Sequence, residues 1–171
     1  MTAQVETETQ PLFAFDGLPF APWCPTDDGV MGGRSRSQFA PTAAGTAAFT
    51  GVVSFENNGG FCSVRSPDFA VGRGRYSGVS LLARGDGKTY TLCLHTQALM
   101  PGMSYRCKFT PPIGEWVELL LPFDDFVLMR FGYRVGVEPV NPDHVRAVSL
   151  MIADKQDGPF ALELARVAVR G

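Results

Sequence analysis

A short loop near the start of the chain concentrates residue types that could bind a ligand. The segment from Asp27 to Ser37 contains two aspartates, three glycines and two arginines. Glycine adopts positive φ without a steric penalty, so the backbone can turn sharply here and pass close to other groups. Arg34 and Arg36 are two residues apart, and in an extended segment their side chains leave the same face. The segment therefore predicts either a binding loop with paired arginines or a structural corner whose charges satisfy each other.

Other combinations of reactive residue types are weaker candidates for chemistry. Cys93 and His95 would share one face of a strand, but no nearby acid is expected to orient the histidine ring, and sheet residues buried for packing are the preferred interpretation. The adjacent acids at 27–28 and 124–125 would point to opposite faces of a strand, which does not suit paired acid–base catalysis. The run Gly85–Thr89 resembles the end of a phosphate-binding loop, but its flanks are strand-like on both sides.

The cysteines and histidines do not form a recognisable metal site. The four cysteines are widely spaced, no Cys-x-x-Cys pair occurs, and the chain has only two histidines. This pattern is typical of free, buried thiols in a reducing compartment. The turn over 154–158 could offer oxygens to Ca²⁺, but it has fewer ligands than a dedicated calcium loop. We therefore expect no metal and no cofactor.

The composition predicts a folded cytoplasmic protein. The chain has 171 residues, of which 45% are hydrophobic and 19% charged, and its net charge is −2. Such a chain can bury a core, and its charge gives no drive toward nucleic acid or anionic membranes. No apolar run is long enough to span a bilayer, and the polar start resembles neither a secretory signal nor a transit peptide. We predict a disordered tail over 1–10, one domain over 11–171, no nucleic-acid partner and no transmembrane segment.

Strand-like runs separated by glycine turns fill most of the chain. A first strand is expected over 11–16, followed by a proline-rich passage whose Phe20 and Trp23 should reach the core. Four pairs of runs are interpreted as hairpins: 47–55 with 61–66, 76–84 with 88–96, 103–110 with 116–122, and 145–153 with 160–169. Apolar and polar residues alternate in several runs, and no window has a persuasive helical period. The pattern predicts an all-β antiparallel sandwich or jelly roll.

Several short motifs, taken in order, resemble one known family. They are Trp23 with Asp28–Ser35, Phe49–Gly51, Asn58–Phe61 with Ser63–Arg65, Arg84–Tyr90, Trp116, Pro122–Phe123 with Phe126, and Ile152–Gln156 with Gly158–Phe160. This part of the chain, about residues 12–169, resembles the domain of complex I intermediate-associated protein 30, an assembly factor for NADH:ubiquinone oxidoreductase. The resemblance implies a galactose-binding-domain-like β-sandwich and a role in assembling a protein complex.

Three hypotheses for function follow. The first is a non-enzymatic binding or assembly module for a respiratory or other multi-subunit complex. Its expected contact residues lie in or beside the motif loops: Asp28, Arg34, Arg36, Asn58, Arg65 and Asp86. The second is a module that binds carbohydrate or another small polar ligand with loops at one end of the sandwich. The third is an enzyme whose cleft contains Asp28, Arg65 and His95. Arg65 should lie along a partly covered surface, where an arginine needs a carboxylate or carbonyls, and Asp28 is its expected salt-bridge partner in a structural clamp. The alternative is that Arg65 contacts a ligand or partner.

Overall fold

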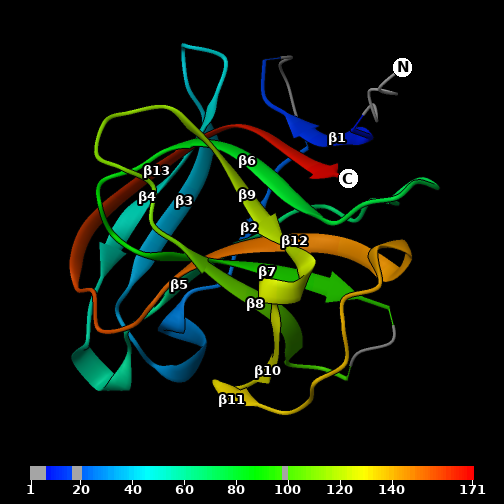
Figure 1. Cartoon of the computed structure of the whole chain (residues 1–171). Helices are drawn as coiled ribbons and strands as arrows, with labels where there is room; N and C mark the ends of the chain where they lie inside the picture. Colours follow the sequence, from blue (N-terminus) through cyan, green and yellow to red (C-terminus); the bar gives the residue numbers. More distant parts are fainter. Residues whose placement is uncertain (1–6, 17–20, 98–99) are drawn as a thin grey trace, which may run out of the picture.

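Two antiparallel sheets form a β-sandwich in the computed structural model, which describes residues 7–16, 21–97 and 100–171 (Figure 1). Sheet A has the order β3 (Arg36–Pro41), β4 (Ala47–Val53), β13 (Gly158–Arg170), β6 (Gly78–Arg84) and β9 (Val117–Pro122), with β1 (Thr9–Ala14) also paired to β13. Sheet B has the order β11 (Tyr133–Arg134), β10 (Val127–Arg130), β8 (Met103–Phe109), β7 (Tyr90–Thr96), β12 (Val145–Ile152), β5 (Cys62–Arg65) and β2 (Cys24–Pro25). The predicted sandwich is confirmed.

The helical turns in the described residues are short and of the 3-10 type: η1 (Asp28–Met31), η2 (Glu56–Asn58), η3 (Phe123–Asp125) and η4 (Pro142–His144). Within that part of the chain, no helix has the length and apolar character needed to cross a membrane.

The core lies between the two sheets and follows the alternation of the strands. On β7, Tyr90, Leu92 and Leu94 are buried in this core. Because successive strand side chains point to opposite faces, the residues between them lie on the outer face of sheet B. Alternation along β8 buries Tyr105, Cys107 and Phe109 in the same way, so the predicted alternation is confirmed.

The four predicted hairpins are wrong in one respect: each turn connects the two sheets instead of pairing its flanking strands. β4 pairs with β3 and β13 in sheet A, whereas β5 pairs with β2 and β12 in sheet B. The connections β6 to β7, β8 to β9 and β12 to β13 also cross between sheets. The hairpins present are β3–β4, β7–β8 and β10–β11. A glycine-rich turn reverses the chain, but it does not decide which sheet receives the next strand, since both sheets cover the same core.

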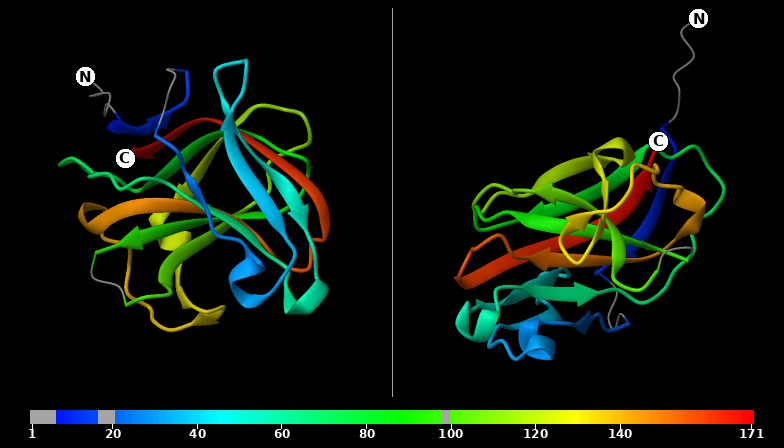
Figure 2. Two further views of the ribbon diagram at one scale, coloured as in Figure 1. Left: turned by 180° about the vertical axis from the view of Figure 1, so that it is seen from behind. Right: turned by 90° about the horizontal axis from the view of Figure 1, so that it is seen from below.

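The N-terminal strand closes the sandwich beside the C-terminus. β1 begins at Thr9, inside the predicted tail, and pairs with the end of β13 (Figure 2). Below it, Trp23 is buried as predicted and stacks on Phe39, with 4.4 Å between ring centroids. Phe20 and residues 1–6 of the predicted tail lie outside the described residues.

Candidate functional site

The glycine-rich loop is folded around the carboxylate of Asp28, which is 0% exposed. Its Oδ1 accepts a hydrogen bond from the backbone N–H of Ser35 at 2.9 Å. Its Oδ2 accepts from the Ser35 hydroxyl, from the Gly60 N–H at 2.6 Å and from the Phe61 N–H at 3.3 Å. Ser35 belongs to the loop itself, whereas Gly60 and Phe61 belong to the Asn58–Phe61 motif. One buried charge therefore joins two sequence motifs.

The charge on Asp28 is stabilised by these donors. Desolvation by itself would raise the pKa of the Asp28 carboxyl, but the hydrogen bonds from Ser35, Gly60 and Phe61 together lower that pKa below its ordinary value of 3.8. Asp28 is therefore ionised at neutral pH while it is shielded from solvent. Asp28 therefore holds the glycine-rich loop in its conformation through buried hydrogen bonds.

Gly33 and Gly59, one from each motif, stand where this carboxylate leaves no room for a side chain. A Cβ on Gly33 would overlap the Asp28 carboxylate, and one on Gly59 would lie 2.5 Å from its Oδ2 and 2.8 Å from the Ser54 carbonyl oxygen. Gly32 ends η1 with φ of 84°, a conformation that favours glycine. Close approach thus accounts for Gly33 and Gly59, and a left-handed turn accounts for Gly32.

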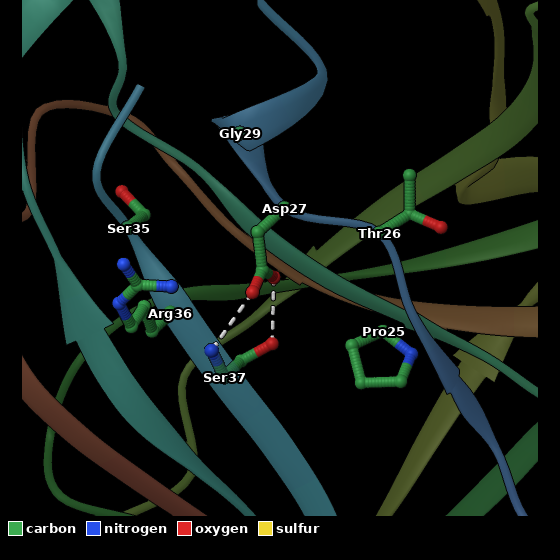
Figure 3. A pocket seen from close by; sticks show the side chains of 7 residues that line it. All are labelled: Pro25, Thr26, Asp27, Gly29, Ser35, Arg36 and Ser37. Carbon is green, nitrogen blue, oxygen red and sulfur yellow. Dashed lines mark hydrogen bonds between the residues drawn. The ribbon is translucent and has the colours of Figure 1, made fainter. Parts of the chain in front are cut away.

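Asp27 forms a second anchor beside an open surface pocket of about 470 Å³. Its carboxylate accepts hydrogen bonds from the Ser37 N–H at 2.8 Å and the Ser37 hydroxyl at 2.6 Å (Figure 3), and from the Ser63 N–H at 3.2 Å. The residues lining the pocket are Pro25, Thr26, Asp27, Gly29, Ser35, Arg36 and Ser37. Arg36 is exposed, so it gives this pocket a positively charged side chain.

Of the other predicted site residues in these loops, Arg34 is exposed and pairs with Glu56 at 3.3 Å. Two exposed partners of this kind contribute little to stability. Asn58 lies in η2, and its side chain is outside the described part of the structure. Arg34 and Arg36 are therefore the predicted cations that the loop presents to solvent.

Asp86 closes the turn between β6 and β7. Its Oδ1 accepts hydrogen bonds from the Lys88 N–H at 3.1 Å and the Tyr90 hydroxyl at 3.0 Å, and its Oδ2 accepts from the Ala161 N–H at 2.9 Å. These contacts hold the turn against the start of β13. Among the described residues, no hydrogen bond or ion pair joins Asp86 to the glycine-rich loop.

The predicted salt bridge between Arg65 and Asp28 is wrong. Arg65 pairs with Asp68 at 3.6 Å, and the oxygens of Asp28 are occupied by the donors of its own loop and of the Asn58–Phe61 motif. Alternation along β5 buries Val64 in the core and leaves Arg65 on the outer face of sheet B. Arg65 therefore lies on the outer face of sheet B, whereas Asp28 is buried inside the glycine-rich loop.

A polar cluster lies on that outer face, and we call it the polar face. Strand register places Arg65 opposite Ser149, Ser149 opposite Cys93, and Cys93 opposite Arg106. Two hydrogen bonds lie within the cluster: His95 Nε2 is 2.6 Å from Ser149 Oγ, and Arg106 Nε donates to Ser104 Oγ at 3.0 Å. The polar face comprises Arg65, Thr91, Cys93, His95, Ser104, Arg106 and Ser149. Sequence reasoning paired Cys93 with His95 and grouped Arg65 with His95 in the enzyme hypothesis. It did not add Ser104, Arg106 or Ser149 to them, because the order of strands in the sheet brings these residues together.

The environment of the polar face keeps its two reactive groups neutral. Burial, followed by the charges of Arg65 and Arg106, lowers the pKa of His95 to about 4. Burial raises the pKa of the Cys93 thiol to about 11. The imidazole is thus uncharged and the sulfur protonated at neutral pH, and the imidazole contacts the Ser149 hydroxyl rather than Cys93. This arrangement does not activate Cys93 as a nucleophile.

The enzyme hypothesis placed Asp28 in one cleft with Arg65 and His95, and the structure separates Asp28 from the other two residues. Asp28 is buried in its loop, and its hydrogen bonds go to Ser35, Gly60 and Phe61 rather than to Arg65 or His95. Within the described ranges, no group of three or more His, Cys, Asp or Glu side chains is placed to hold a metal ion.

A third surface feature is the apolar edge, which we define as Phe131, Tyr133, Val135 and Val137. These side chains are 70%, 76%, 47% and 83% exposed. The edge begins at the β10–β11 turn, where Phe131 has φ of 48°. β11 is the last strand of sheet B, with β10 as its neighbour on one side, and it can be seen at the bottom of Figure 1.

The fold is similar to that of carbohydrate-binding modules. The family 11 module from Clostridium thermocellum, solved in complex with a β-1,3-1,4-mixed-linked tetrasaccharide, superposes with a TM-score of 0.65 at 14% sequence identity, covering 94% of each chain. A family 29 module, CBM29-2, superposes with a TM-score of 0.54 at 11% identity, covering 97% of this chain and 87% of the module. At these identities the likeness shows a shared sandwich fold.

Sequence relatives identify the family. The chain is 26% identical over 170 residues to the mitochondrial complex I intermediate-associated protein 30 of Drosophila melanogaster, covering 86% of this chain and 57% of that protein. It is 27% identical over 169 residues to the Mus musculus protein of the same name, covering 86% and 51%. The chain thus spans little more than half the length of these relatives. The sequence profile of complex I intermediate-associated protein 30 matches residues 13–164, and the chain belongs to that family.

Proposed function

We propose that this chain is a binding module that assists the assembly of a multi-subunit protein complex by docking a partner protein on the apolar edge. The observation that carries the proposal is the exposure of four apolar side chains within residues 131–137 at the edge of a sheet. Clustered apolar residues in water and open sheet edges are typical of protein interaction sites. Family membership supports the kind of partner: an intermediate of NADH:ubiquinone oxidoreductase or of another multi-subunit complex.

The chemistry of the apolar edge favours an extended partner segment with apolar side chains and a carboxylate. Backbone groups on the outer side of β11 can pair with an added strand, which is a common mode of peptide recognition. Arg134 is exposed in this strand, and the Arg130 guanidinium lies 5.3 Å from the ring centroid of Phe131. These cations would favour an acidic residue in the partner and raise the association rate.

Capture from a lysate of cells that make the protein tests this proposal. The full chain is compared with Val137→Asp, which places a charge in the apolar edge, and with Ile113→Asp as a matched control. Ile113 is also an exposed apolar residue, 77% against 83% for Val137, but it lies in the connection between β8 and β9.

We expect subunits of an incompletely assembled complex to be enriched by the unaltered chain and by Ile113→Asp. Enrichment by the Val137→Asp variant should be at least tenfold lower than by the unaltered chain, while its melting temperature stays the same. Equal capture by all three proteins would refute docking on the apolar edge. Absence of any multi-subunit complex from the captured proteins would refute the assembly role.

The exposed loop arginines Arg34 and Arg36 are proposed as additional partner contacts, because they point charge outward beside the pocket at Asp27. Asp28 would support them indirectly by fixing the loop. We also propose a cytoplasmic location, which is supported by the four unpaired cysteines. The carbohydrate alternative is supported by the likeness of fold to carbohydrate-binding modules.

A further inference from the structure

We propose that the polar face of sheet B is a binding site for a small anionic ligand, one that carries a carboxylate or phosphate group held between Arg65 and Arg106. The proposal is independent of the apolar edge, because it concerns the outer face of the central strands β5, β12, β7 and β8.

The middle of the polar face is built from small polar side chains and is bordered by long cationic ones. Ser149 and Cys93 occupy the two positions between Arg65 and Arg106 in one row across the sheet. Neighbouring strands lie about 4.8 Å apart, so the two arginine backbones are separated by about 14 Å. Ser149 and Cys93 are each only 4% exposed, so the ligand would lie on the outer side of this row, with an arginine at each end.

The cations of this face have few partners of their own. Arg65 has one ion pair, with Asp68 at 3.6 Å, and both side chains are largely open to water. Arg106 makes no ion pair among the described residues; its Nε donates to the Ser104 hydroxyl. Guanidinium groups bind carboxylate and phosphate in a bidentate geometry. Arg65 and Arg106 each keep N–H donors available for such contacts.

The neutral pair His95 and Ser149 adds hydrogen bonding without adding charge. The neutral imidazole has one N–H and the serine one O–H, and the 2.6 Å contact between Nε2 and Oγ uses only part of this capacity. An anion can therefore accept a hydrogen bond from this pair while the arginines neutralise it. The positive charges that lower the pKa of His95 are the same charges that an anion would offset.

A neutral sugar fits this face less well. Each of the four central strands contributes outward-facing residues. They are Ser63 and Arg65 on β5; Ala147, Ser149 and Met151 on β12; Thr91, Cys93 and His95 on β7; and Ser104, Arg106 and Lys108 on β8. None of these described side chains is a Phe, Tyr or Trp, so the face lacks a flat aromatic surface for ring stacking. The polar face is therefore better suited to recognising a ligand by its negative charge than by stacking on a sugar ring.

Titrations of the full chain with inorganic phosphate, glucuronate and glucose at constant ionic strength test the proposal. Binding is measured by calorimetry and by the NMR signals of the His95 ring. We expect phosphate, glucuronate or both to move these signals in a saturable way, and glucose to leave them in place. Saturation by phosphate alone assigns a phosphate-bearing ligand, and saturation by glucuronate alone assigns a carboxylate-bearing one.

Matched arginine variants localise the binding. Arg65→Gln and Arg106→Gln should each weaken anion binding at least tenfold, whereas Arg166→Gln should not. Arg166 is a close control, because its side chain is 44% exposed against 47% for Arg65 and it pairs with Glu118 at the same 3.6 Å, but in sheet A. If Arg106→Gln does not fold, Arg65→Gln decides the test by itself.

Three results would overturn the anion site: no saturable shift with either anion, glucose binding as tight as glucuronate, or unchanged affinity in the folded Arg65→Gln variant. The Val137→Asp variant should bind the anions normally. Failure of the anion site and failure of the partner-docking proposal are therefore separate outcomes.

Discussion

At the scale of single residues, the loop that is richest in binding chemistry is organised by a charge that does not reach solvent. Asp28 was expected at a contact surface because acids and glycines cluster around it. The structure places its carboxylate under four hydrogen bonds from Ser35, Gly60 and Phe61. A residue pattern suited to binding an external partner thus binds the protein's own backbone, while Arg34 and Arg36 remain outside.

Replacement of Asp28 by alanine should lower the free energy of unfolding by about 3 kcal/mol or more, because buried donors lose a charged acceptor. Chemical denaturation measures this difference. Asp124→Ala is the control: Asp124 is exposed, and its loss should change stability by less than about 0.5 kcal/mol. Equal effects of the two substitutions would contradict a clamping role for Asp28.

The same carboxylate should make stability sensitive to acid. Its pKa is lower in the folded chain than the ordinary 3.8, so the ionised form stabilises the fold above that pH. This contribution should disappear as the pH falls through the native pKa. In a denaturation series at decreasing pH, the stability gap between the unaltered chain and Asp28→Asn should therefore narrow below about pH 3.8. A constant gap would show that the charge is unimportant.

His95 should remain neutral well below the usual range. Its pKa is lowered from 6.5 to about 4, first by burial and then by Arg65 and Arg106. Because the neutral form is favoured in the folded state, the contribution of His95 is complete above pH 6.5 and declines as the pH falls toward 4. NMR titration of the ring should give a midpoint near 4, with the exposed His144 as a separate signal in the same sample. A midpoint near 6.5 would remove the buried, cationic environment inferred for the polar face.

At the scale of elements, the sequence predicted where strands run but not how they pair. Apolar and polar side chains alternate along 90–95 and 104–109 because one face of each strand is buried. This alternation can be recognised in the sequence, since a shift of one residue would expose the core side chains. Turn residues such as Gly59 and Gly60 report a reversal of the chain. The partner strand is decided by long-range packing across the core, which is why all four predicted hairpins are crossings between sheets.

The β3–β4 pair provides a test of close backbone approach. A Cβ on Gly51 of β4 would overlap the carbonyl oxygen of Arg36 and lie 2.8 Å from the Cα of Ser37 on β3. Alanine normally stabilises an element interior relative to glycine by about 0.5–1 kcal/mol. We expect Gly51→Ala to destabilise the fold instead, by more than about 1 kcal/mol.

Gly29→Ala is the matched control, because its Cβ would meet nothing within 4 Å and its φ is not in the left-handed region. Thermal unfolding should leave Gly29→Ala near or above the melting temperature of the unaltered chain and lower that of Gly51→Ala. If Gly51→Ala is as stable as the control, β3 does not approach β4 as closely as the structure has it.

At the scale of the whole molecule, the sandwich assembles surfaces that no single motif contains. The polar face draws residues from β5, β12, β7 and β8, which are far apart in the chain and adjacent in sheet B. Sequence reasoning grouped Arg65 and His95 with Asp28 in a hypothetical enzyme cleft. It could not combine them with Arg106 and Ser149, since strand order in a sheet is set by the packing of the complete chain.

The accessibility of the four thiols should report the integrity of both sheets at once. Cys24 is exposed, whereas Cys62, Cys93 and Cys107 are buried. Burial raises the pKa of Cys62 to about 12 and those of Cys93 and Cys107 to about 11. Thiolates are the reactive species, so these three sulfurs should react only when the structure opens.

With an aromatic disulfide reagent at pH 8, we expect one equivalent to react rapidly and three to react slowly, with all four reacting rapidly in denaturant. Cys24→Ser should abolish the rapid equivalent in the folded chain. The identity of any additional rapid thiol is informative, because Cys62 and Cys107 lie in the core between the sheets and Cys93 lies on the polar face. Rapid reaction of Cys93 alone would contradict the burial of this thiol on the polar face.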